Sequence, residues 1–123
     1  MMQFESDVEV KFEFVDNKKN SLFQGYRPAH MVKENYLTTG VHKYYNMDNT
    51  EGEIKGTITF ISPEDYPASL WEGKKMEMYE GSQLIGYATI LQIFNPILEK
   101  NKLDQNKRAV KKSLKEKHIY LED

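Results

Sequence analysis

The sequence predicts an all-β antiparallel fold, a barrel or a sandwich of six short strands, with a basic α-helix appended at its C-terminus. Residues 7–14 alternate apolar and polar side chains, as in a strand with one buried face. Turn-forming residues then recur about every ten residues, and no helical period appears before residue 95. After Asn95-Pro96 the composition becomes rich in lysine. We therefore divide the chain into a β domain, residues 1–95, and a basic helix with its tail, residues 96–123.

Length and composition bound the class of protein. A chain of 123 residues is one ordinary domain with a single core. It contains no cysteine, which excludes disulfides, thiolate metal sites and a cysteine nucleophile. The N-terminal residues are acidic where a signal peptide needs a basic start, and no apolar run reaches the roughly 18 residues of a membrane span. We expect a cytoplasmic protein with no membrane partner.

The stretch Phe23–His30 is the most constrained part of the chain. Gly25 tolerates a positive φ, while Pro28 fixes its own φ and pushes Arg27 toward an extended backbone. We expect a sharp corner leading into a strand, with the Tyr26 ring over the core and its hydroxyl on a polar partner. The same residues also suit an ordinary turn with a structural arginine.

The other strands follow from apolar runs and the breaks between them. After the corner we expect strands at residues 31–36, 41–45, 53–61, 74–80 and 83–94. Thr38-Thr39-Gly40 is expected to follow the first of these as a break, and Gly86 to interrupt the last. Gly56 falls at an inward position, where a strand bends or another chain comes close. Residues 62–70 contain two prolines and are expected as a loop over one end of the barrel or sandwich.

Charge is distributed unevenly along the chain. Residues 1–98 hold 9 Lys and Arg against 14 Asp and Glu, whereas residues 99–121 hold 8 against 3. The basic C-terminal helix has only a sparse apolar stripe, so we expect it to need the barrel or a partner for stability. Two interpretations remain open: a solvated helix on its own acidic domain, or an arm that binds a partner or RNA through residues such as Lys107, Arg108 and Lys111.

No catalytic or metal-binding pattern is present. The three histidines are His30, His42 and His118, which are too far apart in sequence for a helical or hairpin metal pair. We expect each of them at the surface or satisfied inside the fold. The motifs H-E-x-x-H and G-x-S-x-G are absent. We expect no enzyme, no catalytic residue, no metal site and no cofactor.

One match to a nucleotide-binding motif is set aside. Asn101-Lys102-Leu103-Asp104 fits N-K-x-D, which reads guanine in GTPases. That motif acts in a doubly wound domain together with a G-x-x-x-x-G-K-S/T phosphate loop, and the chain has no such loop. We therefore expect no nucleotide ligand.

Four motifs in order resemble a known family. They are Phe23-Gln24-Gly25-Tyr26-Arg27-Pro28, Thr38-Thr39-Gly40, the Glu51-Gly52-Glu53 turn, and Tyr79-Glu80-Gly81 followed by Leu84-Ile85-Gly86-Tyr87-Ala88. Together they resemble the C-terminal β-barrel domain of translation elongation factor Tu, over about residues 4–94. The resemblance implies a six-stranded antiparallel barrel, non-catalytic, that touches the T stem of aminoacyl-tRNA and contacts partner proteins.

The family's tRNA-facing pattern falls on Ala29, Thr39, Tyr79, Glu80 and Gly81. Here Ala29 replaces a glutamine and Tyr79 replaces an arginine. The candidate binding residues are Arg27, Thr39, Glu80, Gly81 and Trp71, with Lys107, Arg108 and Lys111 of the basic segment. We expect a translation-factor-like binding module that contacts a protein, with RNA or tRNA as a possible ligand. The alternative is a small scaffold protein, such as an immunity or antitoxin-type partner, without RNA binding.

Overall fold

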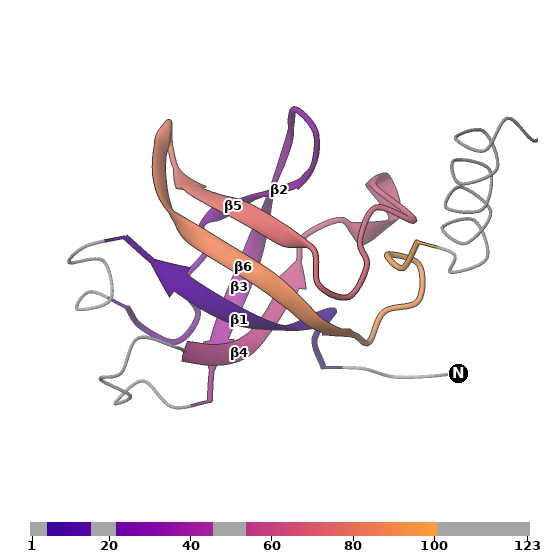
Figure 1. Ribbon diagram of the computed structural model, residues 1–123, viewed down its shortest axis with the longest axis horizontal. Helices are drawn as coiled ribbons and strands as arrows, with labels where there is room; N and C mark the ends of the chain where they lie inside the picture. The colour runs from indigo at the N-terminus through magenta and orange to yellow at the C-terminus, as the bar shows by residue number, and fades with distance from the viewer. Residues whose placement is uncertain (1–4, 16–21, 46–53, 101–123) are drawn as a thin grey trace, which may run out of the picture.

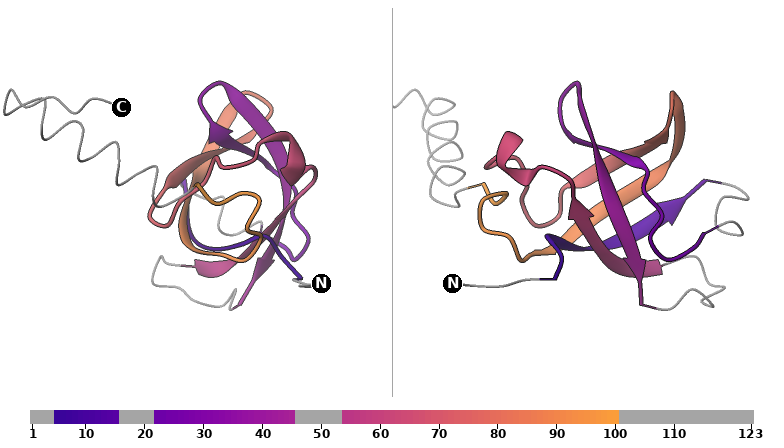
Figure 2. Two further views of the ribbon diagram at one scale, coloured as in Figure 1. Left: turned by 90° about the vertical axis from the view of Figure 1, so that its right-hand side faces the viewer. Right: turned by 180° about the vertical axis from the view of Figure 1, so that it is seen from behind.

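The protein forms a closed six-stranded antiparallel barrel, as the sequence and the family resemblance led us to expect (Figures 1 and 2). The computed structural model describes residues 5–15, 22–45 and 54–100. The strands are β1 (Val8–Phe14), β2 (Ala29–Lys33), β3 (Tyr36–Tyr44), β4 (Ile54–Phe60), β5 (Lys75–Glu80) and β6 (Gln83–Ile93). Around the barrel they follow the order β1-β4-β3-β2-β5-β6, which closes because β6 also pairs with β1. Closure settles the choice between a barrel and a sandwich.

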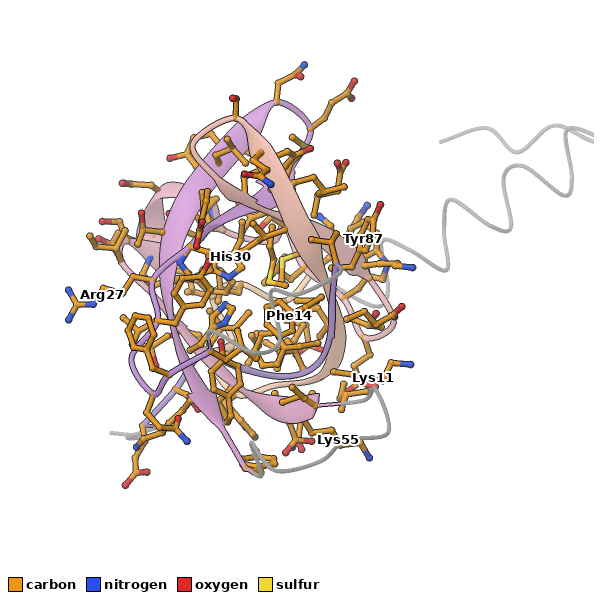
Figure 3. The ribbon with its side chains drawn as sticks, turned by 90° about the vertical axis from the view of Figure 1, so that its left-hand side faces the viewer. Lys11, Phe14, Arg27, His30, Lys55 and Tyr87 are labelled. Atoms are coloured by element: carbon orange, nitrogen blue, oxygen red, sulfur yellow. The ribbon has the colours of Figure 1, made fainter. Side chains whose placement is uncertain are left out.

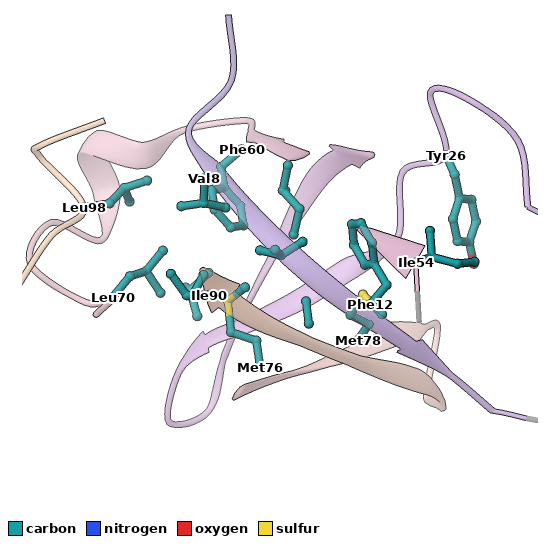
Figure 4. Packing of buried hydrophobic residues seen from close by; sticks show 14 of the residues in the cluster. Val8, Phe12, Tyr26, Ile54, Phe60, Leu70, Met76, Met78, Ile90 and Leu98 are labelled. Carbon is teal, nitrogen blue, oxygen red and sulfur yellow. The ribbon is translucent and has the colours of Figure 1, made fainter. Parts of the chain in front are cut away.

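One continuous core fills the barrel (Figure 4). On β1, Val8, Val10 and Phe12 are fully buried while the polar residues between them face outward, which confirms the predicted alternation. Met76 and Met78 of β5 also point inward and are buried. Each side chain of this size contributes about 1.5–3 kcal/mol when it is fully buried, so the alternation fixes the register of every strand.

The boundary between β2 and β3 differs from the prediction. We expected a strand over residues 31–36 and a break at Thr38-Thr39-Gly40. Instead the turn lies at Glu34 and Asn35, where Asn35 takes a φ of 59°, and the Thr-Thr-Gly stretch lies inside β3. Gly40 is needed for space, because a Cβ there would lie 2.5 Å from Ile58 Cγ2.

Two other glycines also lie inside strands. Gly56 faces inward as predicted, and a Cβ there would lie 2.0 Å from the carbonyl oxygen of Lys43 on β3. Gly86 was expected to interrupt the last strand, but it is part of β6, and its Cβ would lie 2.1 Å from the carbonyl oxygen of Glu13 on β1. Both glycines allow neighbouring strands to approach closely.

Residues 62–70 cover one end of the barrel, as expected of this loop. It contains the short 3₁₀-helix η2 (Pro63–Asp65) and places Tyr66 and Leu70 in the core. Leu70 N–H donates to Leu98 O at 2.9 Å, and Leu98 is itself fully buried. We call residues 62–70 and 95–99 the plug. Leu70 and Leu98 lie at the opposite end of the barrel from Tyr26 (Figure 4).

Asn95-Pro96 begins a turn rather than the expected helix within the described part of the chain. Asn95 Oδ1 accepts a hydrogen bond from Ile97 N–H at 3.2 Å, and the chain then runs parallel to the end of the loop through a bridge between Leu70 and Glu99. Residues 96–100, which we had assigned to the helical part, therefore pack on the barrel. The rest of the expected basic helix, 101–123, lies outside the described residues.

Asp7 holds the start of β1 to the end of β4 and to the residues that follow β6. Its Oδ2 accepts the backbone N–H of Phe60 at 2.6 Å, and its Oδ1 accepts from Asn95 Nδ2 at 2.8 Å. Its carbonyl oxygen also accepts the N–H of Phe94 at 2.8 Å. Asp7 thus joins the ends of β1 and β4 to the residues that follow β6, beside the plug.

Candidate binding surfaces

The Phe23–Pro28 corner is built largely from backbone contacts to β3. Gln24 pairs with Tyr44 like a strand residue, since its Nε2 donates to Tyr44 O at 2.9 Å and its Oε1 accepts Tyr44 N–H at 2.8 Å. Gly25 has a φ of 86°, as predicted, and its N–H donates to His42 O at 2.9 Å. The conformational residues of this motif therefore have structural roles.

Tyr26 links the corner to the β5–β6 hairpin. Its ring is buried and its hydroxyl donates to the Glu80 carboxylate, which confirms the expected polar partner. Burial, together with the hydrogen bond to Glu80 and its negative charge, raises the pKa of Tyr26 above its ordinary value. The corner and the hairpin thus lie at the same end of the barrel.

The positions carried over from the family resemblance come together on the barrel wall. Thr39 of β3 pairs with Ala29 of β2, and Ala29 pairs in turn with Tyr79 of β5. Glu80 and Gly81 follow Tyr79 directly at the hairpin turn. Arg27 is exposed and points away from the barrel at the side of this row (Figure 3).

The row extends along outward positions of β2, β3 and β4 that carry no charge, and the Glu77 carboxylate, which accepts from the Tyr79 hydroxyl, lies at its edge on β5. Ile61 continues it on the β4 side, because its N–H donates to Thr39 O at 3.1 Å, and its side chain is 71% exposed. Beside the row, Met31 pairs with Leu37, which is 47% exposed. We define the uncharged face as the outward residues Ala29, Met31, Leu37, Thr39, Val41, Thr59, Ile61 and Tyr79.

A groove adjoins the uncharged face. It has a volume of about 840 Å³ and shares Val41 and Thr59 with that face. Gln24 and Gly25 of the corner form part of its wall, and Lys43 and Tyr45 continue it along β3. The wall of the barrel is therefore hollowed next to the uncharged face.

Trp71 does not join the corner residues. It directly follows Leu70 of the plug, so it lies at the other end of the barrel from Tyr26 and Glu80. Its ring lies under two ammonium groups, with Lys74 Nζ at 4.5 Å and Lys100 Nζ at 5.4 Å from the ring centroid. The predicted binding residues Lys107, Arg108 and Lys111 lie outside the described residues, as does the N-K-x-D match.

A buried histidine pair lies at the centre of the barrel, and sequence reasoning missed it. His30 Nε2 and His42 Nε2 are 2.7 Å apart, and neither side chain is exposed. From their spacing we expected no helical or hairpin metal pair, and a direct contact between two histidines was not considered. The β2–β3 hairpin brings them together, and Gly40 leaves room for the His30 ring, since a Cβ there would lie 3.0 Å from His30 Cε1.

The partners of this pair fix the direction of every hydrogen bond. His30 Nδ1 lies 3.3 Å from Thr38 O, which can only accept, so His30 carries its proton on Nδ1. His30 Nε2 then accepts, and His42 Nε2 must donate to it. His42 Nδ1 is left to accept from the Tyr44 hydroxyl at 2.7 Å. Both rings are thus neutral, internally satisfied side chains, which was one of the two states expected for each histidine.

Burial sets the protonation of the pair. Removal from water lowers the pKa of His30 and of His42, and at His42 the neighbouring His30 lowers it further. Among residues 5–15, 22–45 and 54–100, no group of three His, Cys, Asp or Glu side chains could hold a metal ion. Because both rings are buried and hydrogen-bonded, the pair is part of the core.

The described chain includes no helix with the length and apolar character needed to cross a bilayer. In comparisons with protein-family models, curated proteins and solved structures, nothing matches this chain. The surfaces themselves therefore provide the basis for a functional proposal.

Proposed function

We propose that this chain is a non-catalytic binding module, with a barrel similar to the C-terminal domain of translation elongation factor Tu, that docks a protein through its uncharged face. The observation that carries the proposal is the row Tyr79, Ala29, Thr39 and Ile61, which runs across four neighbouring strands or their ends. Tyr79, Ala29 and Thr39 belong to the surface that the resemblance implies, and Ile61 adds an exposed aliphatic side chain.

The chemistry of the row favours protein over tRNA. A phosphate-reading surface uses charged and amide donors, and hydrogen bonds to charged groups contribute about 1.5–3 kcal/mol each. Ala29 and Tyr79 stand where the family has glutamine and arginine, so those donors are missing. What remains is a set of apolar and hydroxyl side chains, typical of the centre of a protein interface.

The surroundings of the face support the same proposal. The groove beside Val41 offers a recess for an apolar side chain of the partner. Arg27 at the margin provides a charge that selects the orientation of the partner without needing to be buried. We place the module in the cytoplasm, which suits a chain without cysteine.

Ile61→Glu tests the proposal directly. The immobilised chain is expected to capture a defined protein from host lysate, with components of the translation machinery as the expected class. Since a carboxylate would be buried unpaired in the interface, Ile61→Glu should weaken that capture by roughly a hundredfold or more. Affinity is measured with the purified partner.

Leu91→Glu is the matched control. Leu91 lies on β6 and is 36% exposed, and β6 is not one of the strands that form the uncharged face. This variant should bind as the wild type does, with both variants checked for folding by circular dichroism. Equal capture by Ile61→Glu and the wild type would contradict the proposal.

A further inference from the structure

Trp71 and two lysines form a cluster at the plug end that the proposed function does not use. Lys74 Nζ donates to Val32 O and, at 2.8 Å, to Ser69 O, so main-chain carbonyls fix its position beside the indole. Lys100 is held through its backbone, whose N–H donates to Leu70 O at 2.7 Å. The Lys74 ammonium is therefore fixed next to the ring, and the ammonium of Lys100 lies near the same ring.

The two ammonium groups share one ring and repel each other. Burial lowers the pKa of Lys74, and the positive charge of Lys100 lowers it further. Lys74 already serves the fold by filling the gap between β2 and β5, which pair at only two positions. Lys100 adds a like charge to this place, and an anion bound there would relieve the repulsion.

The exposed ring specifies which anion fits. Trp71 is 37% exposed. A partly exposed indole next to cations suits a ligand that carries both phosphates and aromatic bases. A sulfate or a carboxylate would use the lysines and leave the ring unused.

We propose that Trp71, Lys74 and Lys100 form a binding site for single-stranded nucleic acid, in which the exposed part of the indole stacks on a base and the ammonium groups contact flanking phosphates. Trp71 directly follows Leu70, which lies at the opposite end of the barrel from Tyr26 of the corner (Figure 4). The site is independent of protein docking through the uncharged face, and one chain could hold both ligands.

Trp71 is the only tryptophan in the chain, so its fluorescence reports on the site without labelling. Titration of the full-length protein with a 12-nucleotide oligouridine, or with oligothymidine, should quench this emission to a plateau. Inorganic polyphosphate of equal charge should quench it much less, because it has no base to stack. A difference between the two oligonucleotides assigns the site to RNA or to DNA.

Substitutions separate stacking from charge. Trp71→Leu should weaken oligonucleotide binding, measured by anisotropy of a labelled strand, by roughly tenfold or more. Lys100→Gln should lower the slope of log affinity against log salt by about 0.7. Lys55→Gln is the matched control, because Lys55 is exposed on β4, which β1 and β6 separate from β5. It should leave the affinity within about twofold of the wild type.

Three results would overturn the inference. The first is equal oligonucleotide affinity of Trp71→Leu and the wild type, provided that thermal unfolding shows both to be folded. The second is equal quenching by polyphosphate and by oligonucleotides. The third is Trp71-dependent binding of anionic vesicles without any binding of oligonucleotides. Ile61→Glu should bind oligonucleotides normally and Trp71→Leu should still capture the protein partner, so the failure of one proposal leaves the other intact.

Discussion

At the corner end of the barrel, polar side chains are turned onto the backbone and onto one another, whereas at the plug end two ammonium groups gather around an exposed ring. Gln24 is bonded twice to Tyr44, and Tyr26 to Glu80. At the plug end Lys74 and Lys100 lie beside Trp71 and repel each other. The motif that looks most distinctive in the sequence is thus mainly structural, whereas the less conspicuous residues around Trp71 bring two like charges together.

The largest expected effect tests whether the plug is part of the core. Leu70 is fully buried and bonded through its backbone to residues 98–100. Leu70→Ala should lower the free energy of unfolding by about 2–5 kcal/mol, because it removes apolar contacts and leaves a cavity. Urea unfolding followed by circular dichroism measures the change. A loss below about 1 kcal/mol would mean that the barrel is stable without its plug.

The next effect comes from the histidine pair at the centre of the barrel. Both pKa values are lowered by burial, so the unfolded chain binds more protons than the folded one below about pH 6.5. The stability that the neutral rings provide is present above that pH and is lost as the pH falls. As the pH falls from 7 to 5.5, protonation of these two histidines in the unfolded chain should lower the free energy of unfolding by about 2 kcal/mol.

Urea unfolding at a series of pH values measures this loss. The double variant His30→Leu/His42→Leu should show a much flatter dependence over the same range, whatever its stability at pH 7. Tyr44→Phe is a second variant, in which the acid dependence should remain while overall stability falls by about 1–3 kcal/mol, since His42 Nδ1 loses its donor. If the double variant lost stability with falling pH as the wild type does, the acid dependence could not be attributed to His30 and His42.

The features that the sequence predicted correctly are those that depend on a local pattern of residues. The alternation Val8, Val10, Phe12 identified β1, and the combination of Gly25 and Pro28 identified the corner. Glycines that leave room for a neighbouring strand or side chain were harder to interpret. Gly40 follows two threonines and suggests a turn, but its function is to leave room for the His30 ring and for Ile58, which lie far from it in sequence.

The errors in the site have the same origin. His30 and His42 meet because the turn lies at Asn35, and a turn at residues 38–40 would have separated them. Trp71 was grouped with the corner because sequence order does not show at which end of the barrel a loop lies. The plug settles that point, since Leu70 pairs with the chain that follows β6.

The smallest expected effect tests whether the corner is structural. The Gln24 side chain replaces two strand hydrogen bonds to Tyr44, so Gln24→Ala should lower the free energy of unfolding by about 1–2 kcal/mol. Gln92→Ala on β6 is the control, because Gln92 is exposed and its loss should change stability by less than about 0.5 kcal/mol. Urea unfolding of both variants provides the comparison. If the two variants unfold at the same urea concentration, the corner contributes little to the fold, and its residues would have to be explained by binding instead.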